Sequence, residues 1–126
     1  MRNILIPLII LFIVFAFLTF NIIITLNTTE KLNAALVSAE NFARDGDYEM
    51  AKLKIKEFSD EFENAKKYFS IIISHAEIDN IVISANRLIH LCEEKTAGHF
   101  FAEISVTKEL ITHMRDAELP YLENIL

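Results

Sequence analysis

The hydrophobic pattern divides the chain into one long apolar run and a series of amphipathic segments. The run extends from Ile4 to Leu26 without a charge, and its non-apolar members are Pro7, Thr19, Asn21 and Thr25. As a helix it would rise roughly 35 Å, more than the roughly 30 Å hydrocarbon core of a bilayer. The apolar region of a signal peptide is shorter, at about 7–15 residues. The pattern therefore predicts an uncleaved transmembrane anchor over residues 1–28, with Asn21 at the level of the lipid headgroups rather than bonded to a partner helix.

Beyond the anchor, apolar residues recur at the spacing of one helical face. In the first such segment they follow the i, i+3, i+4, i+7 pattern and are Leu32, Ala35, Leu36, Ala39, Phe42 and Ala43. Asn27 and Glu30 have the spacing of an N-cap and its reciprocal acid, so this helix either starts there or continues from the anchor. Gly46 is expected to end it in the left-handed conformation, and Asp47 to cap the next helix.

The second segment has the most regular pattern in the chain. Its apolar residues are spaced alternately by three and four positions. This heptad seam consists of Tyr48, Ala51, Ile55, Phe58, Phe62, Ala65, Phe69 and Ile72. Such a seam either packs inside its own bundle or pairs with a second chain, and we expect the first.

A capping box of the form S-x-x-E follows the seam. It is formed by Ser74 and Glu77 and predicts that one helix ends at Ser74 and another begins at His75. The apolar face of this third helix consists of Ile78, Ile81, Val82, Ala85, Leu88, Ile89 and Cys92.

The last helix is expected from about His99, after a turn at residues 96–98. Its apolar face consists of Phe100, Ile104, Thr107, Ile111 and Met114. Because Pro120 disfavours a helical conformation at the residue before it, the helix should end at Leu119. Only two glycines and two prolines interrupt the chain, which favours a few long helices over many short strands. We therefore predict an all-α fold, in which residues 29–126 form an antiparallel bundle of about four helices, arranged as two hairpins.

Charge narrows the possible partners of this domain. All 18 acidic residues and 11 of the 12 basic ones follow Thr29, so the domain carries 11 − 18 = −7. An acidic domain is a poor ligand for nucleic acid and is not expected to lie flat on anionic lipid. The positive-inside rule compares the Lys and Arg residues on the two sides of a span. Arg2 precedes the anchor and Lys31 and Arg44 follow it, so the two sides are nearly even. The short head and long tail fit an N-in signal anchor, so we expect an extracytoplasmic domain.

Several short motifs resemble a known family. They are H-A-E-I-D-N-I at 75–81, S-A-N-R-L at 84–88, L-E-N-I-L at 122–126 and the D-Y-E-M-A-K turn, together with the N-terminal anchor. They are similar to those of small bacterial single-pass membrane proteins that share domain of unknown function 4363. The resemblance implies a helical extracytoplasmic domain, no known enzyme activity, and a place beside other membrane proteins. Residues in and beside these motifs are our interaction candidates: His75, Glu77, Asp79, Asn80, Arg87, Asn124 and Leu126.

Metal binding is the main chemical alternative. His75 and Asp79 are one helical turn apart and could reach one ion, but zinc usually takes three or four protein ligands, so His90 or His113 would have to complete the site. Acids at the start of a helix already have a structural role there, because they face its positive end. Arg87 could pair at the surface with Glu94 or with an acid near Asp79, whereas a buried Arg87 would have to find a carboxylate.

The sequence shows no constellation for catalysis. It contains no nucleophile elbow, phosphate-binding glycine loop or HExxH motif, and Cys92 falls on an apolar face, where a thiol is unreactive. We therefore expect no enzyme and no cofactor, and rank a cell-wall hydrolase last. We expect an interaction module that binds another membrane protein or itself. The alternative is a sensor of a metal or small ligand at His75, Glu77 and Asp79.

Overall fold

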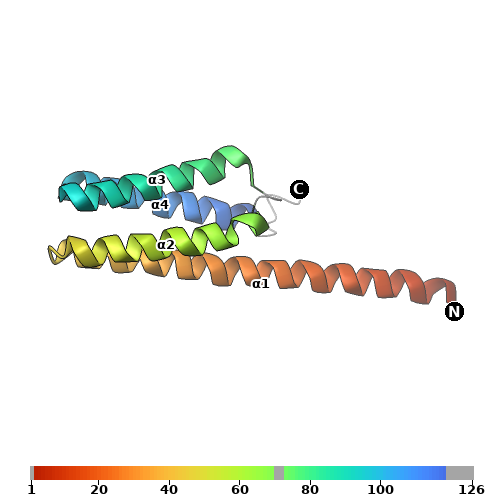
Figure 1. Ribbon diagram of the computed structural model, residues 1–126. Helices are drawn as coiled ribbons and strands as arrows, with labels where there is room; N and C mark the ends of the chain where they lie inside the picture. Colours follow the sequence, from red (N-terminus) through yellow and green to blue (C-terminus); the bar gives the residue numbers. More distant parts are fainter. Residues whose placement is uncertain (1, 70–72, 119–126) are drawn as a thin grey trace.

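The protein is a bundle of four helices, one of which extends far beyond the others (Figure 1). The computed structural model describes residues 2–69 and 73–118. The helices are α1 (Arg2–Arg44), α2 (Tyr48–Phe69), α3 (His75–Glu94) and α4 (Ala97–Glu118), and no strand occurs in these ranges. The all-α prediction is confirmed, while Ile72, Asn124 and Leu126 lie outside the described residues.

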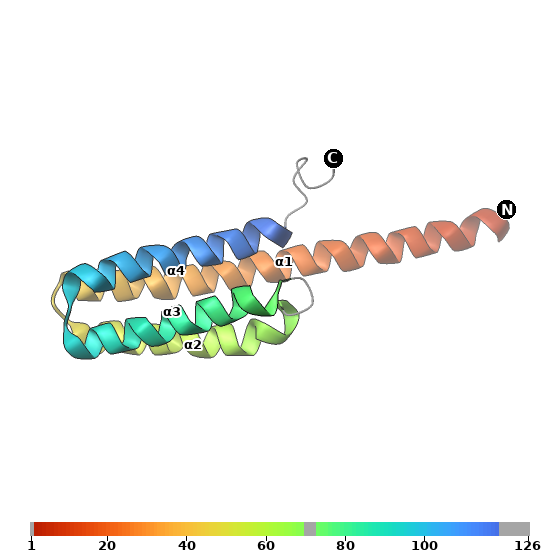
Figure 2. The same ribbon diagram turned by 90° about the horizontal axis from the view of Figure 1, so that it is seen from above.

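The helices form a closed antiparallel ring. α1 packs on α2, α2 on α3, α3 on α4, and α4 returns to α1. Successive helices alternate in direction, and the α1–α2 and α3–α4 joints lie at the end of the bundle away from the protruding part of α1 (Figure 2). α2 and α4 therefore run toward the protruding part of α1, and α1 and α3 run away from it.

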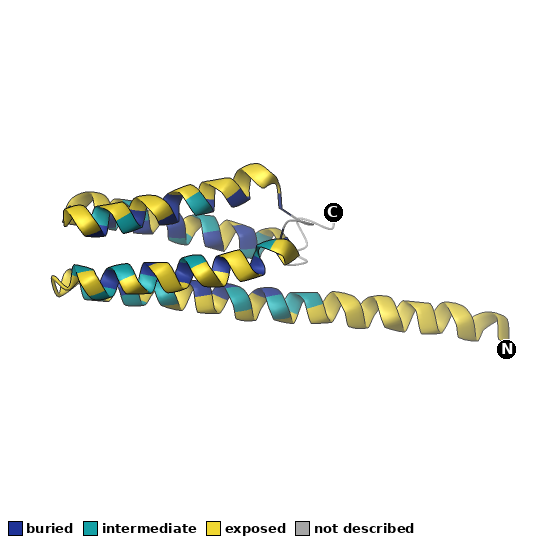
Figure 3. Ribbon diagram, viewed as in Figure 1, coloured by how far each residue is buried: buried dark blue, intermediate teal, exposed yellow. Residues whose placement is uncertain are grey.

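Helix α1 is continuous over 43 residues, a length of about 65 Å. It passes through residues 27–30 without a break, so the second of the two sequence interpretations is the one observed. Side chains up to Phe20 are exposed, whereas Thr25 and Thr29 are buried in the bundle (Figure 3). Among the described helices, only α1 is long and apolar enough to cross a membrane by length and composition.

The polar residues at this transition satisfy their hydrogen bonds within α1. The Asn21 side-chain amide donates to the Phe17 carbonyl at 2.8 Å. The Thr29 hydroxyl donates to the Thr25 carbonyl at 2.9 Å. The Asn21 amide and the Thr29 hydroxyl therefore need no hydrogen-bond acceptor from a second helix.

The heptad seam faces the interior of its own bundle. Ala51, Ile55, Phe58, Phe62, Ala65 and Phe69 are buried, and Tyr48 is partly buried. The rings of Phe58 and Phe62 stack with centroids 6.3 Å apart. The predicted faces of the other helices are largely buried as well, including Leu32, Leu36, Leu88, Phe100, Ile104 and Thr107. The seam is thus used inside the chain and is not available for pairing with another one.

The first joint forms as its sequence predicts. Gly46 has a φ of 79°, a left-handed conformation that glycine adopts without steric cost. The carboxylate of Asp47 then accepts a hydrogen bond from the Met50 backbone N–H at 3.1 Å, which caps the start of α2.

The α3–α4 joint differs from expectation in detail. α4 begins at Ala97, so Gly98 is helical. The left-handed residue at the α3–α4 joint is Lys95, with φ 55° and ψ 40°. Its N–H bonds to the Cys92 carbonyl, and that of Thr96 bonds to the Leu91 carbonyl, which is a Schellman pattern. These backbone bonds define the turn, although no glycine marks it.

Ser74→Ala is expected to cost about 1 kcal/mol of stability. Ser74 is the N-cap of α3: its hydroxyl accepts from the Glu77 N–H at 3.3 Å, and Glu77 accepts from the Ser74 N–H at 3.3 Å. Urea unfolding of the full chain measures the cost. The matched control is Ser105→Ala, at an exposed position inside α4, and equal effects of the two changes would show that the cap contributes nothing.

Candidate functional site

The candidates from the start of α3 lie on an exposed surface. His75, Glu77, Asp79 and Asn80 are all exposed, at the end of the bundle from which α1 protrudes (Figure 1). Glu77 has a structural task, because its carboxylate closes the capping box with Ser74. This region therefore holds an exposed set of polar side chains around a helix start.

The described residues do not assemble the ligand set suggested for a metal. No three His, Cys, Asp or Glu side chains come together among them in a way that could hold an ion. His90 is fifteen residues beyond His75 in the same helix, about 22 Å along its axis. It is too distant to complete a site with Asp79.

Arg87 lies at a different place, above a polar contact between α3 and α4. Its side chain is 65% exposed, and a guanidinium nitrogen is 3.8 Å from a carboxylate oxygen of Glu103, which is only 17% exposed. The structure pairs Arg87 with Glu103 rather than with an acid of α3 such as Glu94. Glu103 lies on the neighbouring helix, and that cross-helix contact depends on the register of α3 against α4.

Two buried hydroxyls hold Glu103 in place. The Ser84 hydroxyl donates to the Glu103 carboxylate at 2.7 Å and lies against the hydroxyl of Thr107. Thr107 donates in turn to the Glu103 carbonyl at 2.9 Å. Buried polar groups need such partners, and here they connect α3 to α4. We call Ser84, Arg87, Glu103 and Thr107 the α3–α4 polar cluster.

A surface groove of about 710 Å³ runs beside this cluster. It is lined by Ile83, Asn86, Arg87, His90, Leu91, His99, Ala102 and Glu103. Ile83 is 47% exposed, as is Val106, which lies one turn from Ala102 and Glu103 along α4. We call this feature the α3–α4 groove. Its lining combines the apolar side chains of Ile83, Leu91 and Ala102 with basic and amide side chains.

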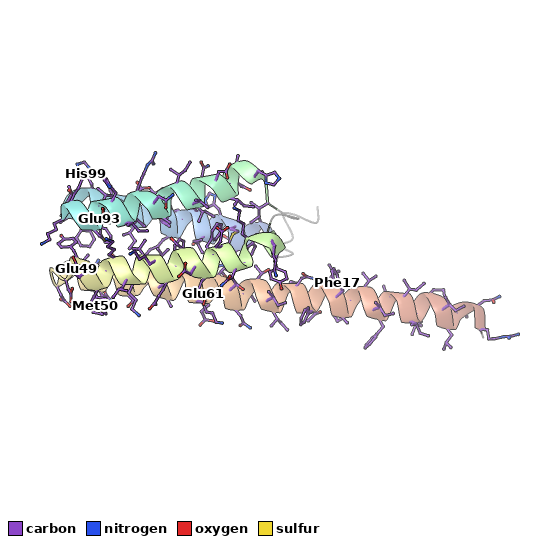
Figure 4. All side chains as sticks on the ribbon, viewed as in Figure 1. Phe17, Glu49, Met50, Glu61, Glu93 and His99 are labelled. Atoms are coloured by element: carbon purple, nitrogen blue, oxygen red, sulfur yellow. The ribbon has the colours of Figure 1, made fainter. Side chains whose placement is uncertain are left out.

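The charge of the α3–α4 groove differs from that of the whole domain. Arg87, His90 and His99 line it, and Glu103 is the one carboxylate among its described lining residues. That carboxylate already accepts from Ser84. Figure 4 shows His99 near the end of the bundle farthest from the protruding part of α1. The lining therefore has a formal charge of 1 − 1 = 0 on a domain of −7, and His90 also lies 3.2 Å from Glu94.

A second groove, of about 590 Å³, lies between α1 and α2. Its charged side chains largely neutralise one another, as in the ion pair of Lys54 with Glu57 at 3.2 Å. Its apolar lining consists of the small residues Ala34 and Ala35. Its lining carries a formal charge of 2 − 3 = −1 and offers no large apolar side chain to a partner, so the α3–α4 groove is the better candidate.

Cys92 is buried and lies on the apolar face of α3, as predicted. Burial raises the pKa of its thiol to about 11, and the opposing effect of the nearby Lys52 ammonium is smaller. The thiolate is the nucleophilic form, so this side chain is a packing residue at neutral pH.

Cys92 is expected to resist alkylation in the folded protein. At pH 8 a pKa of about 11 leaves about one thiolate in a thousand, and the sulfur is also shielded from the reagent. Iodoacetamide followed by mass spectrometry should show negligible labelling of the folded chain and complete labelling in urea. Since this is the only cysteine, the readout is unambiguous. Equal rates in both states would contradict a buried thiol.

An ion pair joins α2 to α3 next to this cysteine. Lys52 and Glu93 lie 2.7 Å apart, and their hydrogen bond raises the pKa of Lys52 and lowers that of Glu93. The lowered pKa of Glu93 contributes stability above its ordinary value of 4.5, lost as the pH falls through the lowered pKa. The raised pKa of Lys52 contributes stability below 10.5, lost at higher pH.

Sequence reasoning missed most of this site. Arg87 was a candidate and Thr107 was placed on a buried face, but Ser84, Glu103 and His99 were not proposed as parts of a site. The spacing of Ser84 from Ile81 and Leu88, three and four residues, puts it on their buried face. That spacing could have marked it as a buried hydroxyl needing a partner.

The fold and its surfaces define a four-helix-bundle protein with a long apolar helical extension. A family model described as Domain of unknown function (DUF4363) matches residues 19–125. The match covers most of the chain, and the protein belongs to this family, as its motifs suggested. A search of curated proteins and a search of solved structures found no match.

Proposed function

We propose that this protein is a membrane-anchored interaction module that binds a segment of another membrane protein in the α3–α4 groove. The observation that carries the proposal is the groove itself, where the exposed Ile83 lies beside Arg87 on an otherwise acidic domain. The apolar half of α1 supports the membrane placement, because it is exposed up to Phe20 and is long enough to span a bilayer.

The chemistry of the groove favours an acidic partner segment with an apolar residue. Arg87 gives carboxylates a planar, permanently charged partner, and His90 and His99 add hydrogen-bond donors beside it. Ile83, Leu91 and Ala102 give an apolar side chain a surface to cover. A basic partner would meet Arg87 at the same place and be repelled, so the groove also discriminates by charge.

Photocrosslinking in native membranes tests the groove. A photoreactive amino acid at Ile83 is expected to give a product that disappears with Arg87→Glu. The matched control is Leu53 on α2, which is 53% exposed against 47% for Ile83. The proposal predicts no product from Leu53. No product from Ile83, or a product unaffected by Arg87→Glu, would refute it. A product of twice the chain mass would show that the groove binds a second copy of this chain instead of another membrane protein.

The placement at the outer face of the cytoplasmic membrane has its own test. The full-length protein should stay with the membranes during a carbonate wash, and added protease should reach the bundle in spheroplasts without lysis. Release by carbonate would overturn the anchoring. Protection of the bundle until lysis would reverse the orientation and leave the groove proposal standing.

A further inference from the structure

A pocket lies between α1 and α4 at the end of the bundle where α1 emerges. Its volume is about 390 Å³, and it is lined by Leu26, Thr29, Glu30, Asn33, Ile111, Thr112 and Arg115. Figure 2 shows α4 beside α1 up to the point where α1 leaves the bundle. We call this the α1–α4 pocket. From it we propose that the protein binds the headgroup of an amine-bearing zwitterionic phospholipid, of the phosphatidylethanolamine type.

The position of the pocket follows from the continuity of α1, and this step depends on the membrane placement proposed above. A hydrocarbon core of about 30 Å takes about 20 residues of helix, so a span that begins at Ile4 leaves the core near Ile23. Leu26 and Thr29 then lie about 5 and 9 Å further along α1. The headgroup layers add about 5–7 Å on each side of the core, so Leu26 lies within the headgroup layer and Thr29 and Glu30 lie just beyond its outer edge.

Arg115 supplies the group that would hold the phosphate. Its side chain is 43% exposed, and its Nε and Nη2 each lie 3.3 Å from Asp116 Oδ1. The described residues give no partner to Nη1, which leaves part of the guanidinium fork for a phosphate oxygen. Because α4 runs antiparallel to α1, Arg115 lies one turn nearer the membrane than Ile111.

The rest of the pocket fits an ammonium donor. The Thr29 hydroxyl donates to the Thr25 carbonyl at 2.9 Å, and the Thr112 hydroxyl to the Lys108 carbonyl at 3.0 Å. Thr29 is buried, so the acceptors that the pocket offers are the exposed Thr112 oxygen, whose proton is committed, and the carboxylate of Glu30. An ethanolamine ammonium has three N–H donors, as a lysine has. A choline group has none, and an anionic glycerol headgroup would be repelled by Glu30.

The apolar members complete the match. Leu26 and Ile111 line the pocket, and Leu26 is the last residue of the apolar run. Leu26 would face the glycerol and upper acyl chain of a lipid that holds its phosphate at Arg115 and its ammonium at Glu30. Because the pocket holds both a cation and an anion, a domain of net charge −7 can bind a zwitterionic lipid there and needs no attraction to anionic lipid.

Lipid titration of the full-length protein tests this assignment. The protein is held in non-ionic, phosphate-free detergent, and phosphatidylethanolamine, phosphatidylcholine or phosphatidylglycerol with matched acyl chains is added. A lipid that binds the folded state raises the melting temperature. We expect phosphatidylethanolamine to bind at least about tenfold more tightly than the other two, since one charge-assisted hydrogen bond accounts for such a factor.

Variants separate the two ends of the pocket. Arg115→Gln should weaken all three lipids at least about tenfold, and Glu30→Gln should abolish the preference for phosphatidylethanolamine while improving phosphatidylglycerol. The matched control is Glu61→Gln, an exposed acid of the α1–α2 groove, which should change nothing. Circular dichroism and urea unfolding establish that each variant folds.

Three results would overturn the assignment. Equal binding of the three lipids, or full binding by Arg115→Gln, would show that the α1–α4 pocket does not recognise the headgroup. An Arg115-dependent rise in melting temperature with inorganic phosphate alone, as large as that with lipid, would make it a site for a free anion. The crosslink from Ile83 and retention after carbonate are measured separately, so failure here is distinguishable from failure of the proposed function.

Discussion

Replacing Phe62 by alanine is expected to destabilise the bundle by about 3–5 kcal/mol. Phe62 is 2% exposed, belongs to the heptad seam of α2, and stacks on Phe58 with the ring centroids 6.3 Å apart. Removing it deletes apolar surface and leaves a cavity that a packed bundle fills only in part. A loss of this size is a large part of the stability of a typical small domain.

Urea unfolding of the detergent-solubilised chain, followed by circular dichroism, measures this loss. Tyr68→Ala is the matched control, because Tyr68 is an aromatic residue of the same helix that is 54% exposed. Its replacement should cost far less than that of Phe62. A cost near zero for Phe62→Ala would mean that the seam does not form the core.

Thr28→Pro is expected to cost about 3 kcal/mol or more. In a continuous α1 this residue is interior, so proline removes a backbone hydrogen bond and its ring clashes with the preceding turn. If a new helix began after an N-cap at Asn27, residue 28 would be its first position, where proline is well tolerated. The variant therefore separates the two interpretations that the sequence left open.

Thermal unfolding and the helical signal of the full chain measure the effect of Thr28→Pro. The control is Thr28→Ala, which removes the same side chain but keeps the backbone donor and favours the helix. The proline variant should lose stability while the alanine variant keeps it. Equal stability of the two would show that the apolar run and the bundle are separate helices.

The predictable part of the fold is the part decided by local signals. Apolar spacing identified the buried faces of all four bundle helices, and Gly46 and Ser74 marked two of the three joints. The third joint was misplaced because its left-handed residue is Lys95, which has no intrinsic preference for that conformation. The continuity of α1 was left open because an Asn27–Glu30 pair suits a helix start and a helix interior equally well.

The candidate site was less predictable because it depends on how two helices face each other. Ser84 and Glu103 are nineteen residues apart and bond across the α3–α4 contact, and no spacing rule within one helix can pair them. The resemblance directed attention to the start of α3, where Glu77 proved to be a capping residue. His75, Asp79 and Asn80 are exposed there, and their proposed contacts stay a prediction.

A helix without a joint between lipid and bundle works as a fixed spacer. With α1 in the bilayer, the start of α3 lies near the lipid surface, and Ile83 and His90 follow about 12 and 22 Å further along that helix. A protein confined to the hydrocarbon layer cannot reach those heights. A partner that binds the α3–α4 groove would therefore need an extramembrane segment that extends that far from the membrane surface.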